Sequence, residues 1–314
     1  MKRSSFQQKI LNRNLISKAL YKIVHISDLH IKKEEHDANT QIFLDLLADI
    51  VKRNCNHLFI TGDITDNAND EEYSKVKNLL SKCNFLNSAT LTVTIGNHDI
   101  FGGAKKGPEV FLFPTECKNT NYYNKVKKFH EQFNESFEQA KLLDEDTVFP
   151  FLKILNDKIA IIGINSIAEW SSDLNPTGSN GNINDNNLKS IKDILTSKKI
   201  RNKLKIILIH HQFNKPVKGK LDDEQNMWLY SERRTMRLHN KKRIFKLFKK
   251  TGFDLILHGH THITNSHKLK GSLFVNSSAS VIPFTKDKKK RYHIINIPDK
   301  TERGNKFTLD VITL

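Results

Sequence analysis

Short runs of apolar and β-branched residues recur along the chain, and each run ends abruptly in polar residues. Runs of this length that are apolar on both faces are typical of strands buried on both sides. The pattern predicts strands at residues 22–26, 58–61, 90–95, 158–165, 205–209, 254–257 and 273–275. Two later runs, 292–297 and 307–312, predict strands joined through a turn-like segment at 298–305.

Amphipathic stretches lie between the early strands. Apolar residues follow the three-and-four spacing of a helix within residues 43–50 and again within 76–80. Residues 171–187 are rich in Asn, Ser and Gly and predict a loop. Because strand and helix alternate, we expect an α/β layered domain.

Length and charge limit the classes of protein to consider. The chain has 314 residues, enough for one large domain spanning 1–314, with a basic extension at 1–20. The net charge of +17 favours anionic partners. Three scattered cysteines are too few for a disulfide framework. With no membrane-spanning run and no secretory signal, we expect a cytoplasmic protein, with peripheral contact at the inner membrane face as an alternative.

Polar clusters follow five of the predicted strands. They are Ser-Asp-Leu-His at 27–30, Gly-Asp-Ile-Thr-Asp at 62–66, Gly-Asn-His-Asp at 96–99, His-His at 210–211 and Gly-His-Thr-His at 259–262. In open α/β sheets, ligands bind outside the carboxyl ends of the strands. The fold can therefore gather all five clusters into one crevice.

The residue types indicate a metal site. Asp, His and Asn without Cys suit Mn, Fe, Zn or Co rather than a structural zinc site. Two carboxylates, one carboxamide and several imidazoles are enough for two cations that share a bridging carboxylate. Such a pair can hold the attacking and leaving oxygens of an in-line phosphoryl displacement.

In this order, the five clusters resemble those of the calcineurin-like metallophosphoesterase superfamily, and the likeness runs from about residue 21 to about 297. The chain more closely resembles the bacterial phosphodiesterase branch, which includes cyclic-nucleotide phosphodiesterases and the UDP-2,3-diacylglucosamine pyrophosphate hydrolases of lipid A synthesis. The resemblance implies a four-layer αββα sandwich, in agreement with the alternation above.

The resemblance also implies roles for individual residues. The first metal would be held by Asp28, His30 and His262, and the second by Asn97, His210 and His260. Asp63 would bridge the two metals, for which manganese is favoured.

Two further residues would act on the substrate. His98 would contact the phosphate and protonate the leaving oxygen, and Asp66 would orient the His98 ring. The family often has Pro two residues after the His of the fourth cluster, where this chain has Gln212, so His211 stays an alternative to His210. We favour His210 because it directly ends the predicted strand.

The function expected from this site is a metal-dependent phosphodiesterase, in which hydroxide activated by both metals attacks phosphorus in line. The alternative is a UDP-2,3-diacylglucosamine pyrophosphate hydrolase at the membrane surface. A nuclease is supported only by the net charge, and a non-catalytic scaffold is disfavoured because every ligand type is present. The expected partner is a phosphorylated small-molecule or lipid-linked substrate, with an anionic membrane surface or a nucleic acid as weaker alternatives.

Two segments bear on the choice of substrate. Residues 101–151 are rich in Phe, and we expect an inserted, partly helical cap beside the site, with an ordinary peripheral subdomain as the alternative. Residues 228–250 hold nine Lys or Arg. They predict either a solvated face or a contact with an anionic surface. Apolar cover and basic charge would both favour the lipid-linked substrate.

Overall fold

The computed structural model describes residues 21–103, 107–143, 148–213, 236–269, 271–277, 280–283, 287–299 and 306–314. The basic extension at 1–20 lies outside the described residues, as do 228–235 of the basic segment. The same holds for 104–106 and 144–147 of the expected cap, and for 300–305 of the expected turn.

Two mixed β-sheets form the centre of the molecule. The first sheet has the order β12 (Thr308–Thr313), β11 (Arg291–Ile297), β1 (Tyr21–Ile26), β2 (His57–Thr61) and β3 (Leu91–Thr94). The second has the order β4 (Lys141–Leu142), β5 (Phe151–Leu155), β6 (Ile159–Ile164), β7 (Leu204–Ile209), β8 (Leu255–His258), β10 (Ser272–Ser277) and β9 (Thr264–Leu269). In each sheet the central neighbours β1–β2–β3 and β6–β7–β8–β10 are parallel. Their carboxyl ends therefore meet at one edge.

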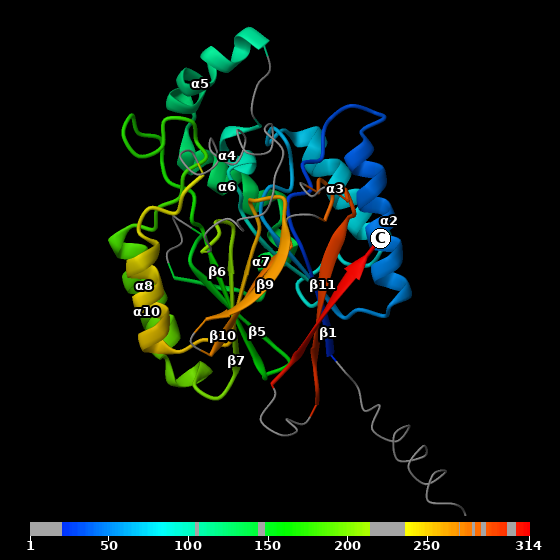
Figure 1. The fold of residues 1–314 in the computed structure, drawn as a ribbon, viewed down its shortest axis with the longest axis vertical. Helices are drawn as coiled ribbons and strands as arrows, with labels where there is room; N and C mark the ends of the chain where they lie inside the picture. Colours follow the sequence, from blue (N-terminus) through cyan, green and yellow to red (C-terminus); the bar gives the residue numbers. More distant parts are fainter. Residues whose placement is uncertain are drawn as a thin grey trace, which may run out of the picture.

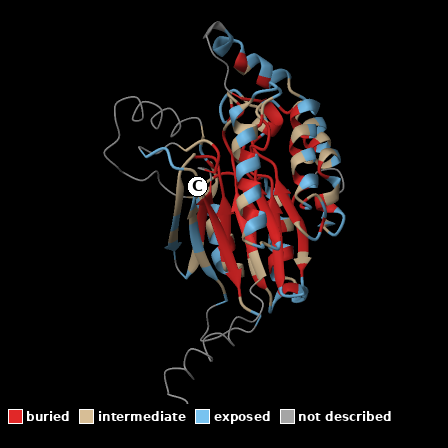
Figure 2. Ribbon diagram, turned by 90° about the vertical axis from the view of Figure 1, so that its right-hand side faces the viewer, coloured by how far each residue is buried: buried red, intermediate tan, exposed pale blue. Residues whose placement is uncertain are grey.

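Helices cover the outer faces of both sheets (Figure 1). The first sheet is covered by α2 (Ala38–Lys52) and α3 (Asp70–Lys82), and the second by α8 (Asp185–Thr196) and α10 (Lys241–Thr251). Each helix turns one apolar stripe inward, which is why burial in Figure 2 is concentrated on the strands and on the inner helix faces. At the start of α3, Asn69 and Glu72 form a reciprocal capping box that satisfies free backbone N–H groups.

Besides the apolar contacts between each sheet and its helices, a separate apolar layer lies between the two sheets. It includes Ile23 and Phe59 of the first sheet and Ile161, Leu208 and Leu257 of the second, all fully buried. Helices, two sheets and helices again therefore make the expected αββα sandwich. Nine predicted strands are confirmed to within two residues at each end. The sequence pattern missed β4, β5 and β9.

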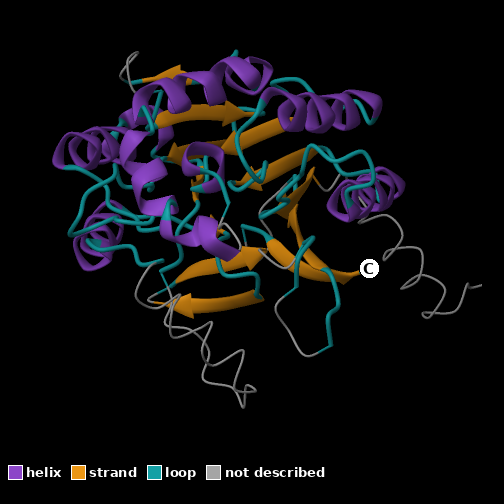
Figure 3. Cartoon of the chain, turned by 90° about the horizontal axis from the view of Figure 1, so that it is seen from above, coloured by secondary structure: helices purple, strands orange, loops and turns teal. Residues whose placement is uncertain are grey.

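Short helices lie beyond the carboxyl ends of the strands (Figures 1 and 3). They are α4 (His98–Phe101), the 3₁₀ turn η1 (Gly107–Phe111), α5 (Phe113–Asn119) and α6 (Tyr122–Gln132). The next short helix, α7 (Asn134–Phe137), lies beside β3, where the backbone N–H of Val93 donates to Ser136 Oγ at 3.2 Å. Six of the seven phenylalanines at 111–151 are core residues, and only Phe111 is exposed. These six rings therefore provide no open apolar surface, and a cap function for the segment stays a prediction.

The other elements add little to the position of the site. A second 3₁₀ turn, η2 (Lys198–Ile200), follows α8. The loop expected at 171–187 ends at residue 184, because Asn184 caps α8 and the helix begins at Asp185. The three cysteines are free thiols. In the part of the chain that the structure describes, none of the helices combines the length and the apolar character required to span a bilayer.

Candidate metal centre

The five polar clusters meet at the carboxyl ends of the central strands. Backbone hydrogen bonds tie their loops together: Asp28 N–H donates to Gly62 O at 3.1 Å, and His30 N–H donates to Asp63 O at 3.0 Å. Gly259 N–H donates to His210 O at 3.1 Å, which links the last two clusters. The candidate ligands are therefore held by five loops from both sheets rather than by one motif.

Asp28, His30 and His262 form the first group. Their nearest ligand atoms lie within 4.8 Å of one another. The His30 and His262 rings are stacked with centroids 5.0 Å apart, and His30 Nε2 lies 4.0 Å from Asp28 Oδ1 and 3.9 Å from Asp63 Oδ2. His262 Nδ1–H donates to Ile282 O at 3.1 Å, which leaves Nε2 as its ligand atom.

Asp63, His210 and His260 form the second group, again with ligand atoms within 4.8 Å of one another. His210 Nε2 lies 3.3 Å from Asp63 Oδ2 and 3.1 Å from Asn97 Oδ1, so Asn97 belongs to the same group. His210 Nδ1–H donates to Thr61 O at 2.8 Å, which orients the ring and frees Nε2.

His211 is placed differently from His210. Its Nδ1 lies 2.8 Å from Ser166 Oγ, and its Nε2 lies 3.1 Å from Ser179 O. Both ring nitrogens are therefore engaged away from the carboxylates. This geometry favours His210 as the ligand.

The residues fit a pair of cations. Nε2 of His30 and Nε2 of His260 are buried and have no hydrogen-bond partner among the described residues. A buried polar atom without a partner is unfavourable, and His30 Nε2 faces the carboxylates of Asp28 and Asp63. In the second group, His260 Nδ1 lies 3.0 Å from His210 Nε2, so this nitrogen is the one turned toward the group. Together with an oxygen-and-nitrogen donor set, these contacts fit a binuclear site.

The backbone of the ligand loops is unusual. Five of the seven candidate ligands have positive φ: Asp28 (57°), His30 (46°), Asp63 (49°), His260 (79°) and His262 (51°). This region is uncommon for residues other than glycine, and such outliers cluster at functional sites.

Two glycines allow the loops to approach so closely. A Cβ on Gly96 would lie 2.2 Å from Asp63 Oδ1, and a Cβ on Gly259 would lie 2.3 Å from Asp28 Oδ2. Any side chain at these positions would displace a candidate ligand. The glycines are therefore part of the site.

Asp99, the last residue of the third polar cluster, positions two of the loops. Its buried carboxylate accepts the backbone N–H groups of Ile64, Thr65 and Gly96 at 2.9–3.1 Å for the shorter contacts. It thereby joins the loop that carries Asp63 to the loop that carries Asn97. Only the contacts, and no motif, reveal this role.

His98 lies at the mouth of the site, with its side chain 20% exposed. Its Nδ1 is 3.2 Å from Asp66 O and 3.5 Å from Asp66 Oδ1, so Asp66 can fix the ring through either oxygen. His98 also lies within 4.8 Å of ligand atoms of His30 and Asp63. Burial would lower the pKa of His98, but Asp63 and Asp66 outweigh it and raise the pKa to about 9.

The buried carboxylates and imidazoles set one another's charge. Burial would raise the pKa of Asp63, but His210 and His98 hold it well below its usual range. Burial would lower the pKa of His210, but Asp63 raises it to about 9. In the absence of cations, protons shared among these groups balance the carboxylates. Metal binding would release those protons.

Comparisons with known proteins agree with this geometry. Residues 21–264 match the family model of calcineurin-like phosphoesterases. No curated protein sequence matches the chain significantly. The fold is similar to a dimetal phosphatase from Danio rerio, with a TM-score of 0.60 and 13% identity over 90% of this chain and 94% of that one.

A second solved structure with a similar fold is the purple acid phosphatase PPD1 from yellow lupin (Lupinus luteus). It has a TM-score of 0.54 and 13% identity, and the match covers 95% of this chain and 54% of the lupin chain. These identities show the fold alone. The match of the family model over most of the chain, with Asp and His clusters consistent with a binuclear metal site, shows that this protein belongs to the calcineurin-like phosphoesterase family of metal-dependent phosphoesterases.

Proposed function

We propose that the protein hydrolyses a phosphodiester. The observation that carries this proposal is the position of His98 beside the two groups of candidate ligands, with Asp63 Oδ2 lying 3.9 Å from His30 Nε2 of the first group and 3.3 Å from His210 Nε2 of the second. Asp28, His30 and His262 would hold one cation, Asn97, His210 and His260 the other, and Asp63 both. Two divalent cations bound there would supply Lewis acidity and an activated water.

Side chains of the protein would donate the proton to the leaving oxygen and orient the proton donor. His98 would keep a proton on the nitrogen opposite Asp66 and deliver it to the leaving oxygen, as a general acid. Asp66 would hold the ring in that orientation through Nδ1. The loop N–H of His98 donates to Asp63 Oδ1 at 2.8 Å, which fixes the acid relative to the shared ligand.

The charge of the site favours a diester over a monoester. Asp28 and Asp63 form no ion pair with a Lys or Arg side chain among the described residues, and Asp66 has only the half-exposed Lys32, at 4.0 Å. Among the described residues, the positive charge beside these carboxylates would come from the cations, the imidazoles and Lys32. A diester carries one negative charge and needs less compensation than a monoester with nearly two.

A second candidate is a lipid-linked nucleotide pyrophosphate, hydrolysed at a membrane surface. Three consecutive apolar residues of the segment above the site are exposed: Val110 (49%), Phe111 (85%) and Leu112 (60%). Such a tip is suited to entering a lipid surface. Co-sedimentation with anionic vesicles that is lost in Phe111→Ser would support this candidate.

A substrate panel tests the proposal. Metal-free protein would be reconstituted with Mn, Fe, Co, Zn or Mg and offered cyclic nucleotides, bis-p-nitrophenyl phosphate, p-nitrophenyl phosphate, nucleotide pyrophosphates, lipid-linked UDP sugars and DNA. We expect turnover of diesters to exceed that of the monoester. A protein that prefers the monoester with every metal would refute the proposal, and activity restricted to the lipid-linked substrate would favour the second candidate.

A further inference from the structure

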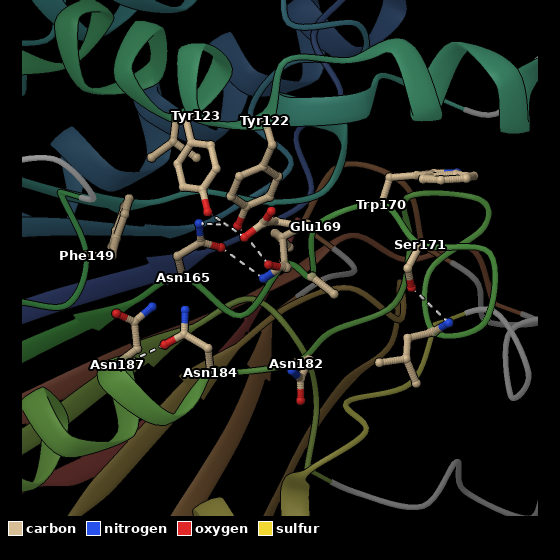
Figure 4. Close-up of a pocket in the computed structure, with 14 residues that line it drawn as sticks. Tyr122, Tyr123, Phe149, Asn165, Glu169, Trp170, Ser171, Asn182, Asn184 and Asn187 are labelled. Carbon is tan, nitrogen blue, oxygen red and sulfur yellow. Dashed lines mark hydrogen bonds between the residues drawn. The ribbon is translucent and has the colours of Figure 1, made fainter.

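A cavity of about 270 Å³ lies next to the metal centre, between α6 and the loop that follows β6. Figure 4 shows Tyr122 and Tyr123 on one side of it and Asn182, Asn184 and Asn187 on the other. No motif of the sequence pointed to this cavity, and the chemistry described above does not use it.

The wall of the cavity is built on residues that contact the metal centre. Ser166, between the lining residues Asn165 and Ile167, lies against His211, whose ring centroid is 4.4 Å from that of His260. On another side, α4 begins at His98 and ends at Phe101, whose ring centroid is 6.2 Å from that of Tyr122. The wall of the cavity is therefore connected to the candidate ligands through Ser166 and His211 on one side and through α4 on the other.

The lining combines aromatic rings with neutral amides. Tyr122 and Tyr123 provide rings, four asparagines provide carboxamides, and Glu169 adds a carboxylate. Among the residues that the structure describes, no Lys or Arg lines the cavity, although the chain carries 51 of them. The cavity is therefore poorly suited to a phosphate, and its polar amides are poorly suited to an acyl chain.

Some of these polar groups are already paired, and others are available. Asn165 Nδ2–H donates to Tyr122 Oη at 2.9 Å, and Tyr123 Oη–H donates to Glu169 Oε1 at 2.7 Å. The carboxamides of Asn182 and Asn187 have no hydrogen-bond partner among the described residues, and both side chains border the cavity. A free carboxamide offers a donor and an acceptor side by side, which matches the edge of a nucleobase.

We propose that this cavity binds the base of a nucleoside carried by the substrate. Asn182 and Asn187 would hydrogen-bond its edge, and the rings of Tyr122 and Tyr123 would contact the base. A volume near the lower limit for small-ligand pockets suits a single base. This inference rests on the proposed phosphodiesterase function, because the phosphate of the same substrate would lie at the metal centre.

Two substrates that differ only in the nucleoside test it. They are the p-nitrophenyl ester of a nucleoside 5′-monophosphate and methyl p-nitrophenyl phosphate, which have the same charge and the same leaving group. We expect the wild-type kcat/KM to be higher for the nucleoside ester by about tenfold or more, as base stacking and hydrogen bonding provide in other proteins. Asn187→Leu and, independently, Asn182→Ala should reduce that preference while turnover of the methyl ester stays within about twofold, because neither residue touches the metal centre.

Asn186→Leu is the matched control, since Asn186 is the exposed neighbour on α8 and does not line the cavity. Equal kcat/KM for the two esters in the wild type would overturn the proposal. So would a p-nitrophenyl ester of ribose 5-phosphate, without a base, that is hydrolysed as well as the nucleoside ester.

Direct binding separates this proposal from the function on which it rests. Free adenosine and free uridine would be titrated into the metal-loaded protein by calorimetry. Binding that is weakened by Asn187→Leu, in a protein that hydrolyses no diester, would refute the phosphodiesterase and keep the base site. Diester hydrolysis without nucleoside binding or nucleoside preference would do the reverse.

Discussion

The backbone N–H of His260 lies 3.0 Å from both carboxylate oxygens of Asp28, although 232 residues separate the two. The first and the last clusters of the chain are thus joined by one bifurcated hydrogen bond at the metal centre. The bond holds the loop of His260 and His262 against the loop of Asp28 and His30.

Asp28→Asn should remove the first metal. The amide keeps the shape of the carboxylate but loses its charge and turns one oxygen into an N–H donor facing His260. We expect loss of about one metal equivalent and a fall in turnover of more than about 100-fold, above the range for outer-shell partners. Metal content by mass spectrometry and hydrolysis of bis-p-nitrophenyl phosphate measure both.

The control is Glu71→Gln, on the exposed face of α3. It removes the same charge from the chain without touching the site and should leave metal content and activity unchanged. If Asp28→Asn keeps both metals, Asp28 is not a ligand.

His98→Ala should retain both metals and lose turnover by about 10²–10⁴-fold, the usual contribution of a general acid. The loss should depend on the leaving group, because a good leaving group needs little protonation. We expect a small loss with p-nitrophenyl esters and a large loss with alkyl esters. Equal losses with both would show that His98 acts otherwise than as the acid.

Asp99→Asn should weaken the site without removing a ligand. The new amide would turn an N–H donor toward the donors of Ile64, Thr65 and Gly96. We expect a loss of about 1–3 kcal/mol in the free energy of unfolding. Metal affinity should fall about 10–100-fold. Urea unfolding and a metal titration measure the two effects, and unchanged metal affinity would show that Asp99 does not position the ligands.

Chelation should lower the melting temperature. Without cations, buried carboxylates and imidazoles face one another, and five ligand residues keep positive φ. A ligand that binds only the folded state at about 1,000 times its Kd stabilises that state by about 4 kcal/mol. Calorimetry with and without metal measures the shift, which should shrink in Asp28→Asn. A melting temperature indifferent to chelator would contradict a preformed metal centre.

Lys153, which lies away from the metal centre, should make the stability of the fold depend on pH. The side chain is fully buried on β5, and its Nζ donates to Leu91 O at 2.8 Å and to Ser136 O at 2.9 Å. Burial lowers its pKa to about 7, although Glu138 opposes the shift. Between this value and the higher unfolded pKa, the unfolded chain binds more protons than the folded one, so stability rises with pH.

The comparison with Lys153→Met isolates this effect. From pH 7 to 9, the free energy of unfolding of the wild type relative to the variant should increase by up to about 1.4 kcal/mol per pH unit. Urea unfolding of the metal-free proteins at pH 7, 8 and 9 measures it. A constant difference would mean that the buried amine keeps its ordinary pKa.

The sequence predicted the parts of the fold that repeat a simple pattern. The central strands are apolar on both faces, and α2 and α3 carry clear stripes, so both were visible in the order of residue types. The strand β9 was not, because Thr264–Leu269 is polar and largely exposed. β5 was obscured because Phe151 continues an aromatic stretch.

The site likewise has parts that the sequence pattern reveals and parts that it does not. Asp28, His30 and the other candidate ligands stand in short clusters after strands, where residue type and order carry the signal. The hydrogen bonds by which Asp99 joins two ligand loops, and the cavity beside Tyr122, depend on contacts between segments far apart in the chain. Tyr122 and Asn165, for example, meet across 43 positions, and neither belongs to a pattern.

The left-handed backbone of Asp28, His30, Asp63, His260 and His262 restricts how the metal preference of this protein can be engineered. Asp, Asn and His tolerate that conformation better than β-branched or bulky residues, so exchanges among these three preserve the loops. Asn97 and His210 have ordinary backbone angles and accept a wider choice of donor. Selection for a softer metal should therefore begin at these two positions.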